Sequence, residues 1–139
     1  PGQLTSNPYC GVVAKFFESA AAGLPFQIYS DGTQTRDYTY IEDAVEALLT
    51  AGTHSAAVGN VFNIGTAVET SVNRLAEMIA EICGITSPVV NYQPKRPVDV
   101  VYRRCLDAGL SYRMLGWKAQ TELAQGLLKT YQWLGGERE

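Results

Sequence analysis

The segment that follows Thr70 carries the clearest structural signal in the chain. Its apolar residues recur at intervals of three and four, the spacing that places them on one face of an α-helix. They are Val72, Leu75, Ala76, Ile79, Ile82 and Cys83. Thr70 or Ser71 offers a side-chain oxygen to cap the start of the helix, and Gly84 stops it. The pattern predicts an amphipathic helix over residues 72–83.

Helical patterns recur along the rest of the chain. Four further segments are expected to be helices: residues 11–20, 42–52, 107–115 and 121–134. In the second of these, Glu42 and Asp43 place negative charge at the helix start, where it is favourable, and Gly52 ends the helix. Thr121 is expected to cap the last helix, which stops before Gly135.

Short apolar runs between the helices predict β-strands at residues 26–29, 61–65 and 89–92. The Ser30-Asp31-Gly32 turn reverses the chain after the first run. The second run, Val61 to Gly65, is bounded by glycines, as a buried strand would be. The sequence therefore predicts an α/β fold that is mainly helical with short strands. Since no repeat or flexible linker interrupts it, we expect a single domain over residues 1–139.

Composition limits the kind of partner. The chain has 46% hydrophobic and 18% charged residues, which is ordinary for a globular protein. Its net charge of −3 argues against general nucleic-acid binding, which needs a basic face. No apolar run approaches the roughly 20 residues of a membrane span, and no secretory leader is evident. These features predict a cytoplasmic protein with a small-molecule partner, no nucleic acid and no membrane.

The cysteines and the single histidine do not suggest a metal site. Cys10, Cys83 and Cys105 are widely spaced and lack a C-x-x-C pair, so we expect three buried small hydrophobic side chains. His54 lies in a polar loop and is expected to be solvated.

Arginines provide the most suggestive chemistry. Guanidinium is the best partner for a diphosphate, because its planar fork of donors meets two phosphate oxygens at once. Arg36 follows a tight turn and precedes an aromatic run, which favours a fixed position. Lys95, Arg96, Arg103 and Arg104 lie within ten residues of one another and would create a positive potential suited to an anion. The alternatives are a surface ion pair for Arg36 and a solvated loop for the basic segment.

Residues 29–44, Y-S-D-G-T-Q-T-R-D-Y-T-Y-I-E-D-A, resemble a segment of the NAD-dependent nucleotide-sugar epimerases and dehydratases, which are extended short-chain dehydrogenases. The family segment reads approximately I-Y-G-D-G-x-Q-T-R-D-F-V-Y-V-D-D. Residues 62–65 match the family's F-N-I-G, where we expect Asn63 to form structural hydrogen bonds. Residues 69–72 and 107–117 are similar to E-T-S-V and D-x-S-K-A-x-x-x-L-G-W, with Leu110 where lysine is usual. The resemblance extends from Pro1 to about Trp133.

The resemblance implies a set of substrate-binding residues: Gln27, Ile28, Tyr29, Arg36, Arg96 and Asp99. In the family, arginines at the positions of Arg36 and Arg96 hold the diphosphate. The strand at residues 27–29 lies against the nucleobase, although Tyr29 is equally explained as a half-buried strand aromatic. Family members carry R-x-G-D where this chain has Arg96 to Asp99, so the chain departs from the family pattern at Val98, a β-branched residue in place of glycine.

The family's catalytic motifs are not found in this sequence. Catalysis in the family requires NAD, bound at a glycine-rich turn, and a tyrosine followed four residues later by a lysine. No two of the thirteen glycines are two positions apart, and none of the eight tyrosines has a lysine four residues on. The opening Pro1-Gly2-Gln3 resembles the end of the family's Y-G-P-G-Q stretch. We therefore expect a substrate-binding domain without its NAD-binding Rossmann domain and with no cofactor bound to this chain alone.

The leading functional prediction is the substrate-binding part of an NAD-dependent epimerase that acts on a UDP- or dTDP-sugar by oxidation and reduction at C4, inactive by itself. A 4,6-dehydratase or a decarboxylase fragment is the near alternative. A non-catalytic module that binds sugar nucleotides or a protein is a second alternative, and an inactive truncated product is a third. The surfaces that normally pack on a nucleotide-binding domain predict association with that domain or self-association.

Overall fold

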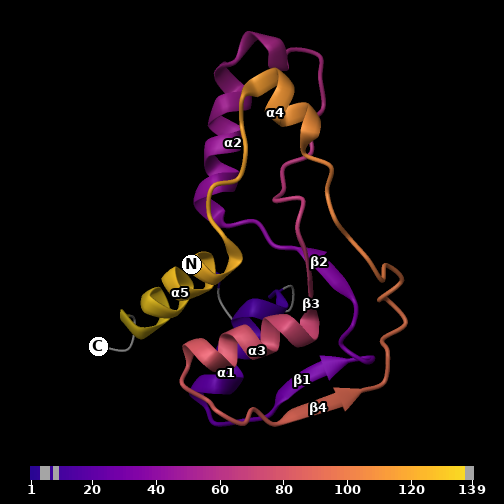
Figure 1. Cartoon of the computed structure of the whole chain (residues 1–139), viewed down its shortest axis with the longest axis vertical. Coiled ribbons are helices and arrows are strands. Elements are labelled where there is room, and N and C mark those ends of the chain that lie inside the picture. Colours follow the sequence, from indigo (N-terminus) through magenta and orange to yellow (C-terminus); the bar gives the residue numbers. More distant parts are fainter. Residues whose placement is uncertain (4–6, 8–9, 137–139) are drawn as a thin grey trace. The chain divides into compact units, whose positions relative to one another are not determined.

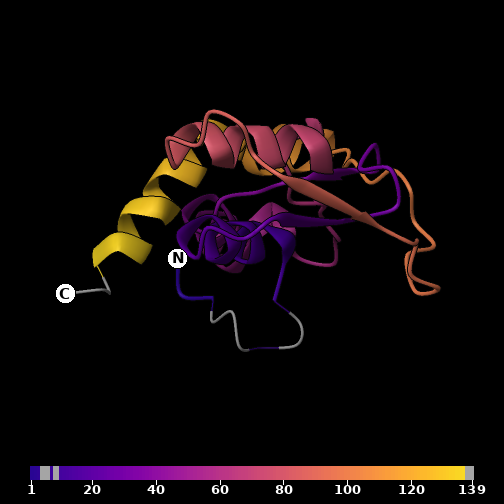
Figure 2. The same ribbon diagram turned by 90° about the horizontal axis from the view of Figure 1, so that it is seen from below.

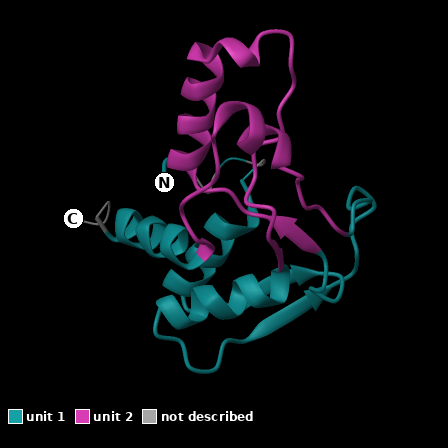
Figure 3. Ribbon diagram, turned by 45° about the horizontal axis from the view of Figure 1, so that its top comes forward, with its two compact units in different colours: residues 1–34, 71–102, 124–139 teal, residues 35–70, 103–123 magenta. Residues whose placement is uncertain are grey.

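The computed structural model describes residues 1–3, 7 and 10–136 (Figure 1). The chain divides into two compact units, each assembled from separate stretches of sequence (Figure 3). Unit 1 comprises residues 1–34, 71–102 and 124–139, and unit 2 comprises residues 35–70 and 103–123. The single substrate-binding domain over residues 1–139 stays a prediction.

Unit 1 is built around a pair of parallel strands with helices packed on them. β1 (Phe26–Tyr29) pairs with β4 (Val90–Gln93) in a register that sets Phe26 opposite Val90 and Tyr29 opposite Gln93 (Figures 1 and 2). The helices are α1 (Val12–Ala21), α3 (Val72–Ile82) and most of α5 (Leu123–Gly136). The strands predicted at residues 26–29 and 89–92 are thus confirmed, the second with a shift of one residue.

The core of unit 1 forms from the apolar faces that the sequence indicated. Phe16 and Phe26 stack with ring centroids 5.0 Å apart, which joins α1 to β1. The helix α3 buries Leu75 and Ile79 completely, as its periodicity predicted. Its N-terminus is capped by Ser71, whose hydroxyl accepts a hydrogen bond from the backbone N–H of Arg74.

Unit 2 contains a second, smaller strand pair and three helical segments. β2 (Thr35–Asp37) pairs with β3 (Glu69–Ser71), whose last residue belongs to unit 1. The helical segments are α2 (Ile41–Thr53), the 3₁₀ turn η1 (Ser55–Ala57) and α4 (Gly109–Leu115). Ala47, Leu115 and Trp117 form the buried centre of this unit, with Phe62 and Ile64 packed against it.

A buried carboxylate near the start of α2 binds the segment that precedes α5. Asp43 is 4% exposed and accepts hydrogen bonds from the backbone N–H groups of Gln120, at 3.2 Å, and Thr121, at 3.0 Å. The sequence indicated Asp43 only as a favourable charge at a helix start. Its larger role is to fix the segment before α5 against α2.

The prediction of a buried strand at Val61 to Gly65 is wrong. These residues form no strand, and Val61 is 89% exposed. Within the described part of the chain no other strand pairs with them, and an unpaired extended segment gains no ladder hydrogen bonds. Phe62 and Ile64 instead bury their side chains against the core of unit 2.

Two of the predicted helix ends are also wrong. The helix α2 passes through Gly52 to Thr53, and α5 includes Gly135 and Gly136. A single glycine costs a helix only about 1 kcal/mol, so neighbouring residues decide whether it ends there. Gly116, by contrast, adopts a φ of 66° and ends α4 as expected.

The cysteines are less buried than the sequence predicted. Cys105 is exposed, which contradicts the expectation, and Cys10 and Cys83 are half-buried. Partial burial raises the pKa of the Cys83 thiol. His54 is exposed, as predicted, and its Nδ1 accepts a hydrogen bond from the backbone N–H of Ala56. Among the described residues, no helix combines the length and apolar character needed to cross a bilayer.

Candidate functional site

Three of the predicted substrate-binding residues meet at one end of the strand pair of unit 1. Tyr29 is the last residue of β1, and Arg96 follows β4 by three positions. The Arg96 guanidinium carbon lies 4.4 Å from the centroid of the Tyr29 ring, in cation–π contact. Asp99 binds the same guanidinium at two points, with Nε to Oδ2 at 2.7 Å and Nη2 to Oδ1 at 2.9 Å. The hydrogen bond to Asp99 raises the pKa of Arg96.

The loop from Arg96 to Asp99 accommodates the residue that departs from the family pattern. The backbone N–H of Asp99 donates to the carbonyl of Arg96 at 3.0 Å, which closes a tight turn. Val98 is 76% exposed and does not have a positive φ. A β-branched residue is therefore compatible with this turn, and a glycine is not required for its backbone conformation.

The remaining predicted residues of unit 1 differ in accessibility. Gln27 is exposed, and its Oε1 accepts a hydrogen bond from Nε2 of Gln93 at 3.0 Å. Ile28 is 1% exposed, with its side chain in the core. Only backbone atoms of Ile28 are therefore candidates for ligand contact, whereas the side chain of Tyr29 is 39% exposed.

The turn after Tyr29 is held by hydrogen bonds within unit 1. Asp31 accepts from the backbone N–H and the hydroxyl of Thr33, at 3.0 and 2.7 Å, and the hydroxyl contact lowers the pKa of Asp31. Asn73 of α3 donates through Nδ2 to the Asp31 carbonyl at 3.0 Å. Gly32 has a φ of 74° and lies so close to the Asn73 amide that a Cβ would overlap it. The turn that positions Tyr29 thus depends on glycine here.

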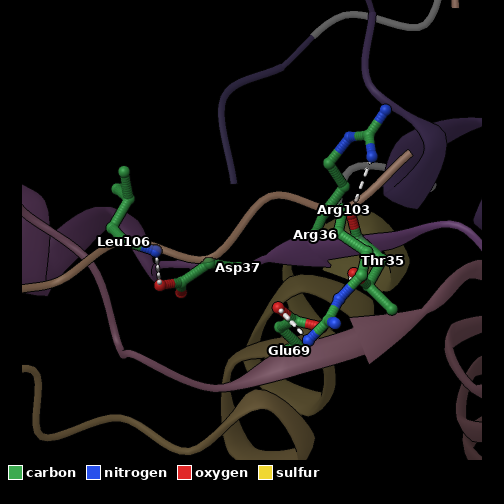
Figure 4. A network of polar contacts seen from close by, with 6 residues as sticks. All are labelled: Thr35, Arg36, Asp37, Glu69, Arg103 and Leu106. Carbon is green, nitrogen blue, oxygen red and sulfur yellow. Dashed lines mark hydrogen bonds and ion pairs between the residues drawn. The ribbon is translucent and has the colours of Figure 1, made fainter. Parts of the chain in front are cut away.

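Arg36, the other predicted diphosphate ligand, is the middle residue of β2 in unit 2. Its side chain is half-buried, and Nη1 donates to the carbonyl of Thr35 at 2.6 Å (Figure 4). The hydroxyl of Thr35 donates to Glu69 at 3.0 Å, and Glu69 also forms a two-point ion pair with Arg103 at 3.1 and 3.0 Å. The Arg103 contact lowers the pKa of Glu69. The basic segment predicted from the sequence is therefore split between the two units. Lys95 and Arg96 belong to unit 1, whereas Arg103 belongs to unit 2, where it forms an ion pair with Glu69.

Asp37 accepts four hydrogen bonds within unit 2, and sequence reasoning missed this role. Its Oδ1 accepts from the backbone N–H of Thr66 at 3.0 Å and from the Thr66 hydroxyl at 2.6 Å. Its Oδ2 accepts from the N–H of Ala67 at 3.0 Å. It also accepts from the N–H of Leu106 at 3.4 Å, the contact drawn in Figure 4. The sequence offered only two signals of this network: the position of the carboxylate directly after Arg36, and Gly65 of the F-N-I-G match.

Asn63 lies in the same unit and behaves as a structural residue. Its Nδ2 donates to the backbone carbonyl of Asp107 at 3.2 Å, as the prediction of structural hydrogen bonding requires. Its side chain is nevertheless exposed rather than buried. Among the residues with described positions, no three His, Cys, Asp or Glu side chains gather as metal ligands would.

Comparison with known proteins agrees with the resemblance. Residues 1–65 match the family described as the NAD dependent epimerase/dehydratase family. The chain is 40% identical over 122 residues to UDP-glucose 4-epimerase of Mycolicibacterium smegmatis, covering 88% of this chain and 38% of that enzyme. It is 32% identical over 135 residues to UDP-N-acetyl-alpha-D-glucosaminuronate decarboxylase of Bacillus cytotoxicus, covering 91% of this chain and 40% of that enzyme.

A solved structure extends the agreement to the fold. UDP-glucose 4-epimerase of Thermotoga maritima, determined with UDP-glucose, superimposes with a TM-score of 0.87 and 37% identity, over 96% of this chain and 42% of that one. The fold is therefore that of part of an extended short-chain dehydrogenase. Within that class, the chain belongs to the NAD-dependent epimerase/dehydratase family, as its sequence predicted. It spans about two fifths of the length of these relatives.

Proposed function

We propose that this chain is the sugar-nucleotide-binding part of an NAD-dependent nucleotide-sugar 4-epimerase. The observation that carries the proposal is the assembly of Tyr29, Arg96 and Asp99 at the end of β1 and β4. This assembly places the aromatic face of Tyr29 beside the planar, charged guanidinium of Arg96. A nucleoside diphosphate offers the complementary groups, which are a flat base and an anionic diphosphate. The similarity to UDP-glucose 4-epimerases supports the choice of reaction.

In this proposal the residues divide between the phosphates, the nucleobase and the sugar of the ligand. Arg96 and Arg36 bind phosphate oxygens, and the side chain of Tyr29 packs on the nucleobase. Gln27 and the backbone of Ile28 offer polar groups to the edge of the base. Asp99 orients Arg96 and, when the pair opens, accepts a hydrogen bond from a sugar hydroxyl.

The residues of this chain do not fit the cofactor's site. The family name implies NAD, which would supply hydride acceptance and return when bound. The sequence offers neither a G-x-G turn for the pyrophosphate nor a Tyr–Lys pair for proton transfer. We therefore assign no step of the reaction to this chain and propose that it is inactive by itself.

An apolar stripe on α2 supports the proposal that the chain has a protein partner. Ile41, Val45, Leu48 and Leu49 share one helix face and are 50%, 46%, 71% and 66% exposed. Exposed apolar faces of this kind usually bind another protein surface. We propose that the NAD-binding domain, or a second copy of the chain, covers it. A cytoplasmic location stays a prediction.

The similarity to a UDP-N-acetyl-alpha-D-glucosaminuronate decarboxylase favours a second candidate, in which the same binding part serves a decarboxylase or a 4,6-dehydratase. These reactions begin from the same class of nucleotide sugar. A non-catalytic module for sugar nucleotides is the alternative from another class.

Calorimetric titration of the chain with UDP-glucose tests the proposal. We expect saturable binding that is weakened by at least about tenfold in Arg36→Ala and in Arg96→Ala, because each change removes a charge-assisted contact to phosphate. Glu46→Ala, on the exposed face of α2, is the control and should bind as the wild type does. A folded wild-type chain that does not bind would contradict the proposal.

A further inference from the structure

The two neighbours of Arg36 in β2 are both anchored through their side chains. Successive side chains of a strand point to opposite faces, so Thr35 and Asp37 share one face and Arg36 projects from the other. Thr35 is bound to Glu69 at 3.0 Å, and Asp37 is bound to Leu106 (Figure 4). Asp37 is also bound to the loop at Thr66. The backbone at Arg36 is thereby held from both sides.

Asp37 makes the more extensive of these two anchors. Successive N–H groups at Thr66 and Ala67 both donate to its carboxylate, the first to Oδ1 and the second to Oδ2. Gly65 packs directly beside it, since a Cβ there would lie 2.7 Å from Oδ2 of Asp37 and 2.9 Å from Cβ of Leu106. The loop is shaped to enclose this one carboxylate.

Strand pairing alone would hold Arg36 weakly. β2 has three residues, and in the described part of the chain it pairs with β3 only. An isolated two-stranded ribbon is marginally stable in water. The bonds to Asp37 connect β2 to segments 29 and 69 residues away in sequence, which fixes the strand independently of its ladder.

We propose that Asp37 is a positioning residue that acts on a bound diphosphate through Arg36. The inference rests on the proposed role of Arg36 as a diphosphate ligand. Its donors hold the Asp37 carboxylate in place, so Arg36 meets the phosphate from an already ordered strand, and less conformational freedom is lost on binding.

The test compares UDP with uridine, which lacks the phosphates, by calorimetric titration of the chain. In Asp37→Asn we expect UDP to bind about tenfold more weakly and uridine to bind unchanged. In an Arg36→Ala background the same substitution should have no further effect on UDP. Asp107→Asn is the matched control, because it removes another carboxylate of unit 2 that accepts a backbone N–H, that of Gly109 at the start of α4.

A milder pair of variants decides the question if Asp37→Asn does not fold. Thr66→Val removes the hydroxyl that lies 2.6 Å from Oδ1 of Asp37, whereas Thr66→Ser keeps a hydroxyl. We expect Thr66→Val to weaken UDP binding roughly threefold and Thr66→Ser to restore it.

The outcomes separate the inference from the function on which it rests. Wild-type binding of UDP that depends on Arg36 but is insensitive to Asp37 and Thr66 would overturn the positioning role and leave the proposed function intact. Equal losses for UDP and uridine, or additive losses in the double variant, would mean that Asp37 is only structural. A wild-type chain that binds no UDP would overturn both.

Discussion

Tyr29 lies with its ring centroid 4.4 Å from the guanidinium carbon of Arg96, although the two residues come from distant parts of the sequence. The parallel register explains the contact, because it sets Tyr29 opposite Gln93, three positions before Arg96. A two-point ion pair with Asp99 holds the guanidinium in this place. The contact therefore depends on the planar shape of arginine as well as on its charge.

Arg96→Lys tests that dependence on shape. Lysine keeps the charge but can neither pair with Asp99 at two points nor lie flat over Tyr29, so we expect UDP affinity to fall by about tenfold, as in Arg96→Ala. Calorimetric titration measures the effect. Lys95→Ala removes an exposed charge next to it and should change the affinity less than about twofold. If Arg96→Lys bound UDP as the wild type does, charge alone would account for the role of Arg96.

Two glycine substitutions should have opposite effects on stability. Gly65→Ala brings a Cβ within 2.7 Å of Asp37 Oδ2, so we expect the free energy of unfolding to fall by about 1–3 kcal/mol. Gly52→Ala lies in α2, with no atom within 4 Å of the new Cβ, and should raise it by about 0.5–1 kcal/mol. Urea denaturation measures both changes. Equal effects of the two substitutions would contradict the close approach at Gly65.

Removal of the Asp43 carboxylate should destabilise unit 2. Asp43→Ala leaves the backbone N–H groups of Gln120 and Thr121 without their acceptor, at a cost of about 2 kcal/mol. The fluorescence of Trp117, which is 3% exposed, reports the unfolding of this unit in a Trp133→Phe background. Glu46→Ala on the same helix is the exposed control. A loss no larger than that of the control would show that Asp43 does not hold the segment before α5.

Tyr38→Phe is expected to leave stability unchanged or to increase it. The hydroxyl of Tyr38 is buried without a hydrogen-bond partner among the described residues, and burial raises its pKa. An unsatisfied buried hydroxyl costs roughly 1–3 kcal/mol, so its removal relieves that cost. Thermal unfolding tests this expectation, and a clear decrease in the melting temperature would mean that the hydroxyl has a partner in solution.

The ion pair of Glu69 predicts a dependence of stability on pH. The folded pKa of Glu69 is lowered below its ordinary value of 4.5, first by the hydrogen bond from Arg103. A lowered carboxyl pKa stabilises the fold above the ordinary value, and this contribution is lost as pH falls through the folded value. The difference in urea midpoint between wild type and Glu69→Gln should therefore be larger at about pH 7 than at about pH 3. A difference that does not change with pH would contradict the pairing.

The elements predicted correctly are those specified by local sequence. The periodicity of α3, its cap at Ser71 and the short run of β1 all depend on residues within a few positions of one another. The extended segment from Val61 to Gly65 was misjudged because a strand requires a distant partner, which periodicity does not reveal.

The candidate site was predictable in its chemistry and not in its geometry. The resemblance indicated Arg36, Arg96 and Asp99, but the sequence did not indicate that Asp99 would bind Arg96 directly. It also missed Asp37, whose partners at Thr66 and Leu106 lie 29 and 69 residues away. Such contacts arise only when the chain folds back on itself, so a reading of neighbouring residues does not detect them.

The most direct test of the account is the nuclear magnetic resonance of the arginine side chains during addition of UDP-glucose. With the chain labelled with ¹⁵N, Arg36→Ala and Arg96→Ala assign the two Nε–H signals. We predict that both signals shift in a saturable way, whereas the signal of Arg74, which pairs with Glu77 on α3, stays unchanged. If neither arginine signal moves at saturating UDP-glucose, the chain does not bind a sugar nucleotide through these residues, and the central claim is wrong.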